Sequence, residues 1–220
     1  MLKDEVRRRI TGVGIVPVVR ASSPREALDA VEAVCKGGIR IVEITMTVPG
    51  AMEIIRELIK SGEPDVLVGA GTVLNPESAR RCLDAGAQFI VSPGLNLNTI
   101  ELAQKEGVLV MPGAFSPTEI IAAWDAGADL VKVFPCGNVG GPKYIKALKG
   151  PLPQIPLIPT GGVTLENAAE FILAGSEALG IGGELVQNAA LRAGKPEIIT
   201  EAARKFVEIV KKARDQSTSA

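Results

Sequence analysis

Short apolar runs rich in β-branched residues recur along the chain and are separated by amphipathic segments. They predict eight strands, near residues 14–19, 39–45, 66–71, 88–92, 108–112, 130–134, 156–160 and 178–182. Short runs that are apolar at nearly every position are typical of strands buried on both faces, as in a parallel sheet. Their alternation with helices predicts right-handed βαβ units.

The segments between the strands carry repeated helix-end signals. Glycine-containing phrases at 36–39, 84–87, 125–128 and 174–176 each close a helix, and their glycines suit a left-handed cap. Ser23 and Ser116 are each followed by proline and, three residues on, by glutamate, which predicts a capping box. Two further helices are expected from about Leu2 to Ile10 and from about Pro196 to Arg214.

Eight βα units in 220 residues predict an α/β fold, a compact (β/α)8 TIM barrel. No linker is visible, so residues 1–220 are expected to form a single domain with an extra N-terminal helix. The alternative is an open doubly wound sheet. Against it, the nearest match to a dinucleotide-binding turn, Gly69–Leu74, lacks the third glycine.

The composition of the chain excludes several classes of partner and of catalytic site. The net charge of −1 offers no overall field to attract nucleic acid or an anionic membrane. The chain has no histidine, which excludes Ser-His-Asp and Cys-His catalysis and every histidine-containing metal site. Its three cysteines are widely spaced, as in proteins of a reducing compartment, and neither a signal peptide nor a long apolar run is present. We therefore expect a cytoplasmic protein.

Two predicted strands contain a charged residue within an apolar run. Lys132 lies among valines, where loss of ammonium hydration would favour the neutral amine that attacks a carbonyl. Glu43 is then the general acid/base, since no histidine is available for proton transfer. The alternative is that Glu43 and Lys132 form a buried structural ion pair, or that the lysine reaches out of the strand end.

Other candidates stand where strands end. Gly161–Gly162 and Gly182–Gly183 follow the last two strands, where barrels commonly bind phosphate on backbone N–H groups, although tight turns also need glycine. Arg20 ends the first strand and is either a clamp for a substrate carboxylate or a surface arginine. Cys136 has no base beside it and is expected to be a packing residue.

Taken together, five motifs resemble the 2-keto-3-deoxy-6-phosphogluconate (KDPG) aldolase family, which includes 4-hydroxy-2-oxoglutarate (KHG) aldolases. The motifs are Val42–Thr45, Val68–Val73, Val91–Gly94, Lys132–Pro135 and Pro159–Val163. They occur in order between about residues 14 and 186, nearly the whole predicted barrel.

The resemblance implies a class I aldolase, a carbon–carbon lyase of the Entner–Doudoroff pathway, in which Lys132 forms an imine and Glu43 moves protons. It implies cleavage of KDPG to pyruvate and glyceraldehyde 3-phosphate, and of KHG to pyruvate and glyoxylate, without metal or other cofactor, by a homotrimer. Positions matched to the substrate pocket are Thr47, Thr72, Pro93, Phe134 and Thr160, and those matched to the phosphate loops are Gly161, Gly162, Gly182 and Gly183.

Two departures from the family pattern bear on the substrate. Thr47 stands where many relatives carry arginine, and Arg20 is expected to supply that charge from the first strand. Glu184 stands where relatives often carry serine, so its carboxylate must point away from a bound phosphate. The alternatives are an aldolase for the phosphogalactonate epimer or for an unphosphorylated 2-keto-3-deoxy acid, and a non-catalytic oligomeric barrel.

Overall fold

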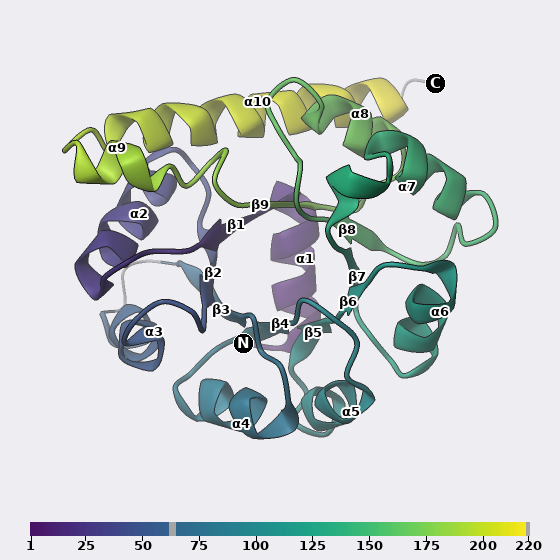
Figure 1. The fold of residues 1–220 in the computed structure, drawn as a ribbon, viewed down its shortest axis with the longest axis horizontal. Helices are drawn as coiled ribbons and strands as arrows, with labels where there is room; N and C mark the ends of the chain where they lie inside the picture. The colour runs from purple at the N-terminus through teal and green to yellow at the C-terminus, as the bar shows by residue number, and fades with distance from the viewer. Residues whose placement is uncertain (62–64, 219–220) are drawn as a thin grey trace.

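A curled parallel sheet surrounded by helices makes up the fold in the computed structural model, which describes residues 1–61 and 65–218 (Figure 1). The strands are β1 (Ile15–Val19), β2 (Ile41–Thr45), β3 (Leu67–Gly71), β4 (Phe89–Val91), β5 (Leu109–Met111), β6 (Gly113–Ala114), β7 (Val131–Val133), β8 (Leu157–Pro159) and β9 (Leu179–Ile181). Each predicted strand contains an observed one, which confirms the α/β class. The two-residue β6 was not predicted.

The strands lie side by side in the order of the chain. One hydrogen-bonded set has the order β5-β4-β3-β2-β1-β9, and a second has the order β6-β7-β8. Only Pro112 separates β5 from β6, and a single bridge between Thr160 and Gly180 joins the end of β8 to β9. A doubly wound sheet reverses its strand order at a switch point. Here β9 does lie beyond β1, but the chain passes from β5 through Pro112 into β6-β7-β8, and the end of β8 bridges back to β9, so the curled sheet does not have the open order of the doubly wound alternative.

The helices lie around the outside of the curled sheet, except that α1 is seen through its middle (Figure 1). They are α1 (Lys3–Val13), α2 (Pro24–Lys36), α3 (Ala51–Lys60), α4 (Pro76–Asp84), α5 (Leu97–Lys105), α6 (Pro117–Asp125), α7 (Pro142–Lys149), α8 (Ala168–Leu173), α9 (Asn188–Arg192) and α10 (Glu197–Thr218), with a 3₁₀ turn η1 (Cys136–Val139). The last helix is one turn longer than expected. Within the described chain, no helix has the length and apolarity to cross a membrane.

Helix ends largely follow the sequence signals. Gly86 and Gly127 adopt left-handed conformations with φ of 100° and 93°, as the caps require. Ser116 and Glu119 form the complete capping box that opens α6. At α2 the box is incomplete: Ser23 accepts from the Glu26 N–H, but the Glu26 carboxylate bonds to Ser22 instead.

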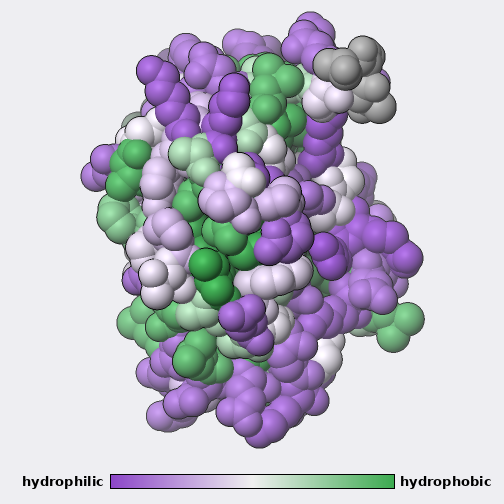
Figure 2. Space-filling view, turned by 90° about the vertical axis from the view of Figure 1, so that its right-hand side faces the viewer, coloured by the Kyte–Doolittle hydropathy of each residue, from purple (hydrophilic) through white to green (hydrophobic). Residues whose placement is uncertain are grey.

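The outer helices bury one face and leave some apolar side chains in water. On α6, Ile120 is fully buried, Trp124 is half-buried and Ile121 is 42% exposed. Phe115, just before α6, is 43% exposed. Hydrophobic side chains gather near the centre of the face on which α6 and α7 lie (Figure 2). Ile120 therefore faces the sheet, and Ile121 does not.

Glu119→Gln should lower the stability of the fold, and the effect should depend on pH. The Phe115 and Ser116 N–H groups and the Ser116 hydroxyl bond to the Glu119 carboxylate and hold its pKa below the ordinary 4.5. The folded-state pKa is the lower one, so the stabilisation is present above the unfolded-state pKa and is lost as pH falls through the folded one. We expect the free energy of unfolding to fall by about 1 kcal/mol at pH 7.

Urea unfolding at pH 7 and at pH 3 measures this difference, with the exposed Glu57→Gln on α3 as the control for loss of one charge. An equal effect of Glu119→Gln at both pH values would contradict the assignment.

Candidate active site

The register of β1, β2 and β3 places Glu43 on one face together with Val18 and Gly69. Val18 pairs with Glu43, and Glu43 pairs with Gly69. Paired residues of parallel strands direct their side chains to the same face, and every second residue of a strand returns to it. Gly69 leaves room on this face for the Phe89 side chain, since a Cβ at Gly69 would lie 2.1 Å from the Phe89 ring. Such crowding across strands is expected on the concave side of a curled sheet.

The same reasoning brings Lys132 to this concave face. Lys132 pairs with Ile158, and Thr160 follows two residues later on the same face. Thr160 bridges to Gly180, which pairs with Val16 of β1, two residues before Val18. Lys132, Thr160 and Glu43 therefore share one face, although they come from β7, the end of β8 and β2.

Glu43 is buried beneath the end of β3. It is 2% exposed, and its Oε1 atom has no hydrogen-bond partner among the described residues. The carboxylate lies over Gly71, where a Cβ would stand 1.8 Å from Oε1. A buried carboxylate oxygen without a partner is costly to the fold, and such groups commonly have a functional role. Glu43 therefore has an acceptor oxygen available to a bound molecule.

Lys132 is also buried, at 4% exposure, and its Nζ lies 5.3 Å from the centroid of the Phe134 ring. Within the described chain, neither an ion pair nor a hydrogen bond to a protein group engages Nζ. From the sequence, a structural ion pair between Lys132 and Glu43 was the alternative to catalysis, and that alternative is wrong. Both groups remain available to a third molecule.

Three of the other expected pocket residues lie at the carboxyl ends of strands beside this pair. Thr72 directly follows β3 with φ of 59°, a left-handed conformation that is strained for a β-branched residue. Pro93 follows β4, and a Cβ at Gly113, the partner of Lys132, would lie 2.2 Å from its carbonyl group. Thr160 is 7% exposed, and its Oγ1 leans over Gly180.

The expected glycine loops follow neighbouring strands. Gly161 and Gly162 both have φ of 83°, which only glycine adopts readily, and Gly161 packs against the Phe134 ring. Gly182 and Gly183 begin the turn after β9, in which the Leu185 and Val186 N–H groups donate to the Gly182 carbonyl. The next residue, Glu184, is exposed, so water solvates its carboxylate.

Arg20 and Thr47 lie at the ends of β1 and β2. Arg20 is two residues after Val18 and four after Val16, so by the alternation of the strand it lies on the same face as Glu43. Its side chain is exposed. The Thr47 hydroxyl lies 2.8 Å from that of Thr45, which in turn donates to the Val19 carbonyl. Thr47 is thus tied to the end of β1 beside Arg20.

Neither Cys82 nor Cys136 is suited to act as a nucleophile in the site. Burial raises the pKa of the Cys136 thiol to about 12 and that of Cys82 to about 11, so neither is a thiolate at neutral pH. The expectation that Cys136 is a packing residue is confirmed. No group of three or more Cys, Asp or Glu side chains suited to a metal occurs in the described part of the chain.

Sequence reasoning missed the glycines that make room for the reactive groups. Gly71 lies in the nearest match to a nucleotide motif and in the family motif Val68–Val73, but no role was expected for it, because its role depends on the pairing of β2 with β3. Gly113 was missed for the same reason. The available signal was a pair of glycines in a strand next to one that carries a buried charge.

Comparison with known proteins now identifies the family. The model of the KDPG and KHG aldolases matches residues 6–202. The chain belongs to this aldolase family. It is therefore an aldolase, a carbon–carbon lyase, as the resemblance implied.

Relatives match this aldolase along most of their length. The KHG/KDPG aldolase of Escherichia coli K12 is 37% identical over 207 residues, 94% of this chain and 96% of the relative. A 2-dehydro-3-deoxy-6-phosphogalactonate aldolase of the same strain is 39% identical over 176 residues, 80% of this chain and 85% of the relative. The KDPG aldolase of Legionella pneumophila, solved with pyruvate captured as a covalent carbinolamine, has a TM-score of 0.84 at 31% identity and covers 91% of this chain and 97% of its own.

Gly71→Ala should impair the aldolase by displacing Glu43. The added methyl group would overlap the carboxylate, and misplacement of a reacting group by about 1 Å costs on the order of 100-fold in rate. We expect kcat for aldol cleavage to fall by about that factor while circular dichroism shows a folded chain. The control is Gly12→Ala on α1, where a Cβ meets nothing within 4 Å. A Gly71→Ala enzyme with wild-type kcat would show that Glu43 does not need this position.

Proposed function

We propose that this aldolase reversibly cleaves KDPG to pyruvate and glyceraldehyde 3-phosphate, and KHG to pyruvate and glyoxylate, through an imine on Lys132. The observation that carries the proposal is the presence of Lys132 and Glu43, both buried, on one concave face with no ion pair between them. An amine and a carboxylate that do not neutralise each other can act as nucleophile and proton carrier. The covalent carbinolamine in the Legionella relative supports the same chemistry.

The proposed reaction uses two residues in sequence. The neutral Lys132 amine adds to the keto carbon C2, and the carbinolamine takes up a proton from solvent and loses water to give an iminium; hydrolysis returns that proton to solvent at the end of the cycle. Glu43 takes the proton of the C4 hydroxyl, the C3–C4 bond breaks, and its electron pair moves into an enamine while the aldehyde leaves. Glu43 then returns a proton to C3, and water hydrolyses the imine to release pyruvate and the free lysine. The lysine iminium accepts the electron pair, so the proposal requires no metal or other cofactor.

The remaining site residues are proposed to bind the substrate. Arg20 would hold the carboxylate, with Thr47, Thr72 and Pro93 along the same wall, while Thr160 and Phe134 would face the hydroxyl-bearing carbons. The phosphate would lie on the loops that contain Gly161, Gly162, Gly182 and Gly183. Support comes from their places at consecutive strand ends and from the left-handed glycines after β8.

We also propose that residues 1–220 form one domain, a closed (β/α)8 barrel with α1 as an extra helix. The short interruption at Pro112 supports continuity of β5 with β6, because proline lacks the N–H that a ladder needs. The N–H of Lys132 on β7 donates to the carbonyl of Pro112, between β5 and β6. The N–H of Glu177, just before β9, donates to the carbonyl of Leu157 on β8. Together with the Thr160–Gly180 bridge, these bonds support closure on both sides of the second strand set.

The working form is proposed to be a cytoplasmic homotrimer of the Entner–Doudoroff pathway. The exposed Phe115 and Ile121 support burial of this face against another copy. A solved cage with a TM-score of 0.82 to this chain was designed by fusing symmetric oligomeric domains. Light scattering in solution should give the mass of three chains, and a mass of one chain would contradict the trimer.

The phosphogalactonate epimer is the second candidate substrate, favoured by the 39% identity to an aldolase of that name. The epimers differ only in hydroxyl configuration, which a few pocket contacts decide. Comparison of kcat/KM for KDPG, its galactonate epimer, KHG and unphosphorylated 2-keto-3-deoxygluconate tests the proposal. The highest value for KDPG supports it, and the highest value for the epimer overturns it. Equal kcat/KM values for the phosphorylated and unphosphorylated substrates would show that the glycine loops do not bind phosphate.

Arg20→Ala should raise KM for pyruvate in the condensation direction. Loss of a charge-assisted, bidentate contact to a carboxylate corresponds to about 10- to 100-fold. Arg20→Lys should give an intermediate KM, since lysine lacks the planar fork. The exposed Arg25→Ala on α2 is the matched control. An unchanged KM in Arg20→Ala would show that Arg20 is a surface arginine only.

A further inference from the structure

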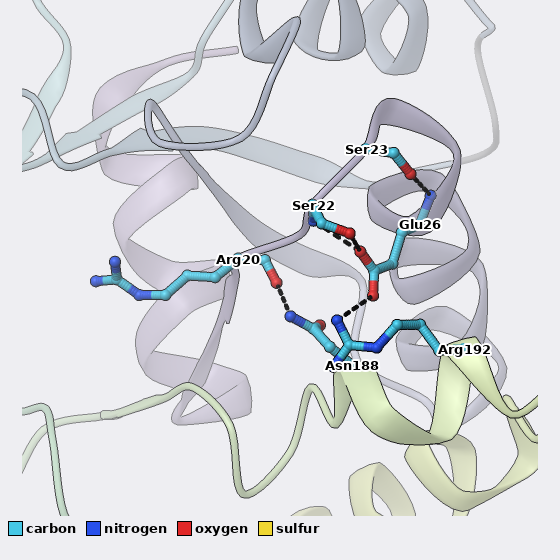
Figure 3. A network of polar contacts seen from close by, with 6 residues as sticks. All are labelled: Arg20, Ser22, Ser23, Glu26, Asn188 and Arg192. Carbon is cyan, nitrogen blue, oxygen red and sulfur yellow. Dashed lines mark hydrogen bonds and ion pairs between the residues drawn. The ribbon is translucent and has the colours of Figure 1, made fainter.

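Asn188 joins two segments that are far apart in the sequence. It is the first residue of α9, which follows β9 and the Gly182–Gly183 turn. Its Nδ2 donates a hydrogen bond of 2.6 Å to the main-chain carbonyl of Arg20, at the end of β1 (Figure 3). The proposed carboxylate clamp is thus tied to the element that follows the proposed phosphate loop.

The Arg20 side chain is not held by its own contacts. It extends away from Asn188 and α9 (Figure 3), and within the described chain its guanidinium forms no hydrogen bond or ion pair. The position of the guanidinium therefore depends on where the main chain of Arg20 lies. A long side chain on a loose main chain would lose much of its binding free energy to ordering.

A second contact holds the same loop from the side of α2. The Ser22 N–H and hydroxyl both donate to Oε2 of Glu26, which is 7% exposed. These two bonds lower the pKa of Glu26, and Arg192 on α9 faces the other carboxylate oxygen at 3.8 Å. The residues just after Arg20 are therefore fixed to α2, while the Arg20 carbonyl is fixed to α9.

Two buried acceptor oxygens in this arrangement lack hydrogen bonds within the described part of the chain. Asn188 Oδ1 and Glu26 Oε1 are buried and accept no hydrogen bond from the described residues. Unsatisfied buried acceptors destabilise a protein, and apolar packing between α9 and the β1–α2 loop would avoid them. The polar contact is better explained by the position that it gives to the Arg20 main chain.

We infer that Asn188 is a positioning residue for Arg20: its amide fixes the end of β1 so that the guanidinium meets the substrate carboxylate. The inference rests on the proposed role of Arg20. It predicts that Asn188 affects keto-acid binding only through Arg20, and that it leaves the imine and proton-transfer steps unchanged.

A double-mutant cycle tests this with wild type, Arg20→Ala, Asn188→Ala and the double variant, each assayed for condensation of pyruvate with glyceraldehyde 3-phosphate. Asn188→Ala should raise KM for pyruvate about 3- to 10-fold and change kcat less than about twofold. In the Arg20→Ala background it should have no further effect on KM. Asn188→Asp, which keeps the shape but cannot donate, should raise KM at least as much.

Arg192→Gln on the same helix is the matched control, because it removes only the 3.8 Å contact to Glu26 Oε1 and leaves both Ser22–Glu26 bonds and the Asn188 bond in place. Its KM for pyruvate should stay near the wild-type value, and thermal unfolding should show that every variant is folded. The inference is overturned, while the proposed function stands, in either of two cases. In the first, Arg20→Ala raises KM for pyruvate but folded Asn188→Ala and Asn188→Asp do not. In the second, Asn188→Ala raises KM as much in the Arg20→Ala background as in wild type. If wild type condenses no pyruvate, the proposed function is overturned and the inference with it.

Discussion

Two buried ionisable side chains, Glu43 and Lys132, are held on one face of the sheet without forming an ion pair, and the rest of the site depends on this separation. The register of the parallel strands produces it, because pairing fixes which residues share a face. Gly71 adds the space in which the carboxylate lies. A direct ion pair would offset part of the cost of burial but would also occupy both groups.

The surrounding structure positions the reactive pair and the groups expected to bind the two ends of the substrate. Strained or glycine-dependent backbone, as at Thr72 and at Gly161–Gly162, lies at the carboxyl ends of strands. Such conformations persist only where the scaffold determines them. The inferred role of Asn188 extends this principle to the end of β1, where its amide holds the Arg20 main chain while its own Oδ1 atom lacks a hydrogen bond among the described residues.

Local sequence signals predicted much of this molecule. Strand positions, left-handed glycines and the α6 capping box depend on neighbours in the chain, and a charge inside an apolar strand marked both Glu43 and Lys132. Contacts between distant segments were not predictable. The Glu26 carboxylate was expected to close the α2 capping box but bonds to Ser22 and faces Arg192, and the Asn188 bond to Arg20 spans most of the chain. The roles of Gly71 and Gly113 required the register.

The central claim is that Lys132 forms an imine with a keto acid. Sodium borohydride reduction in the presence of excess pyruvate, followed by peptide mass spectrometry, tests it most directly in wild type and in Lys132→Ala. The account predicts one reduced pyruvyl adduct, on the peptide that contains Lys132, and no adduct in the variant. A folded wild-type protein without an adduct, or an adduct on another lysine that persists in Lys132→Ala, would contradict it.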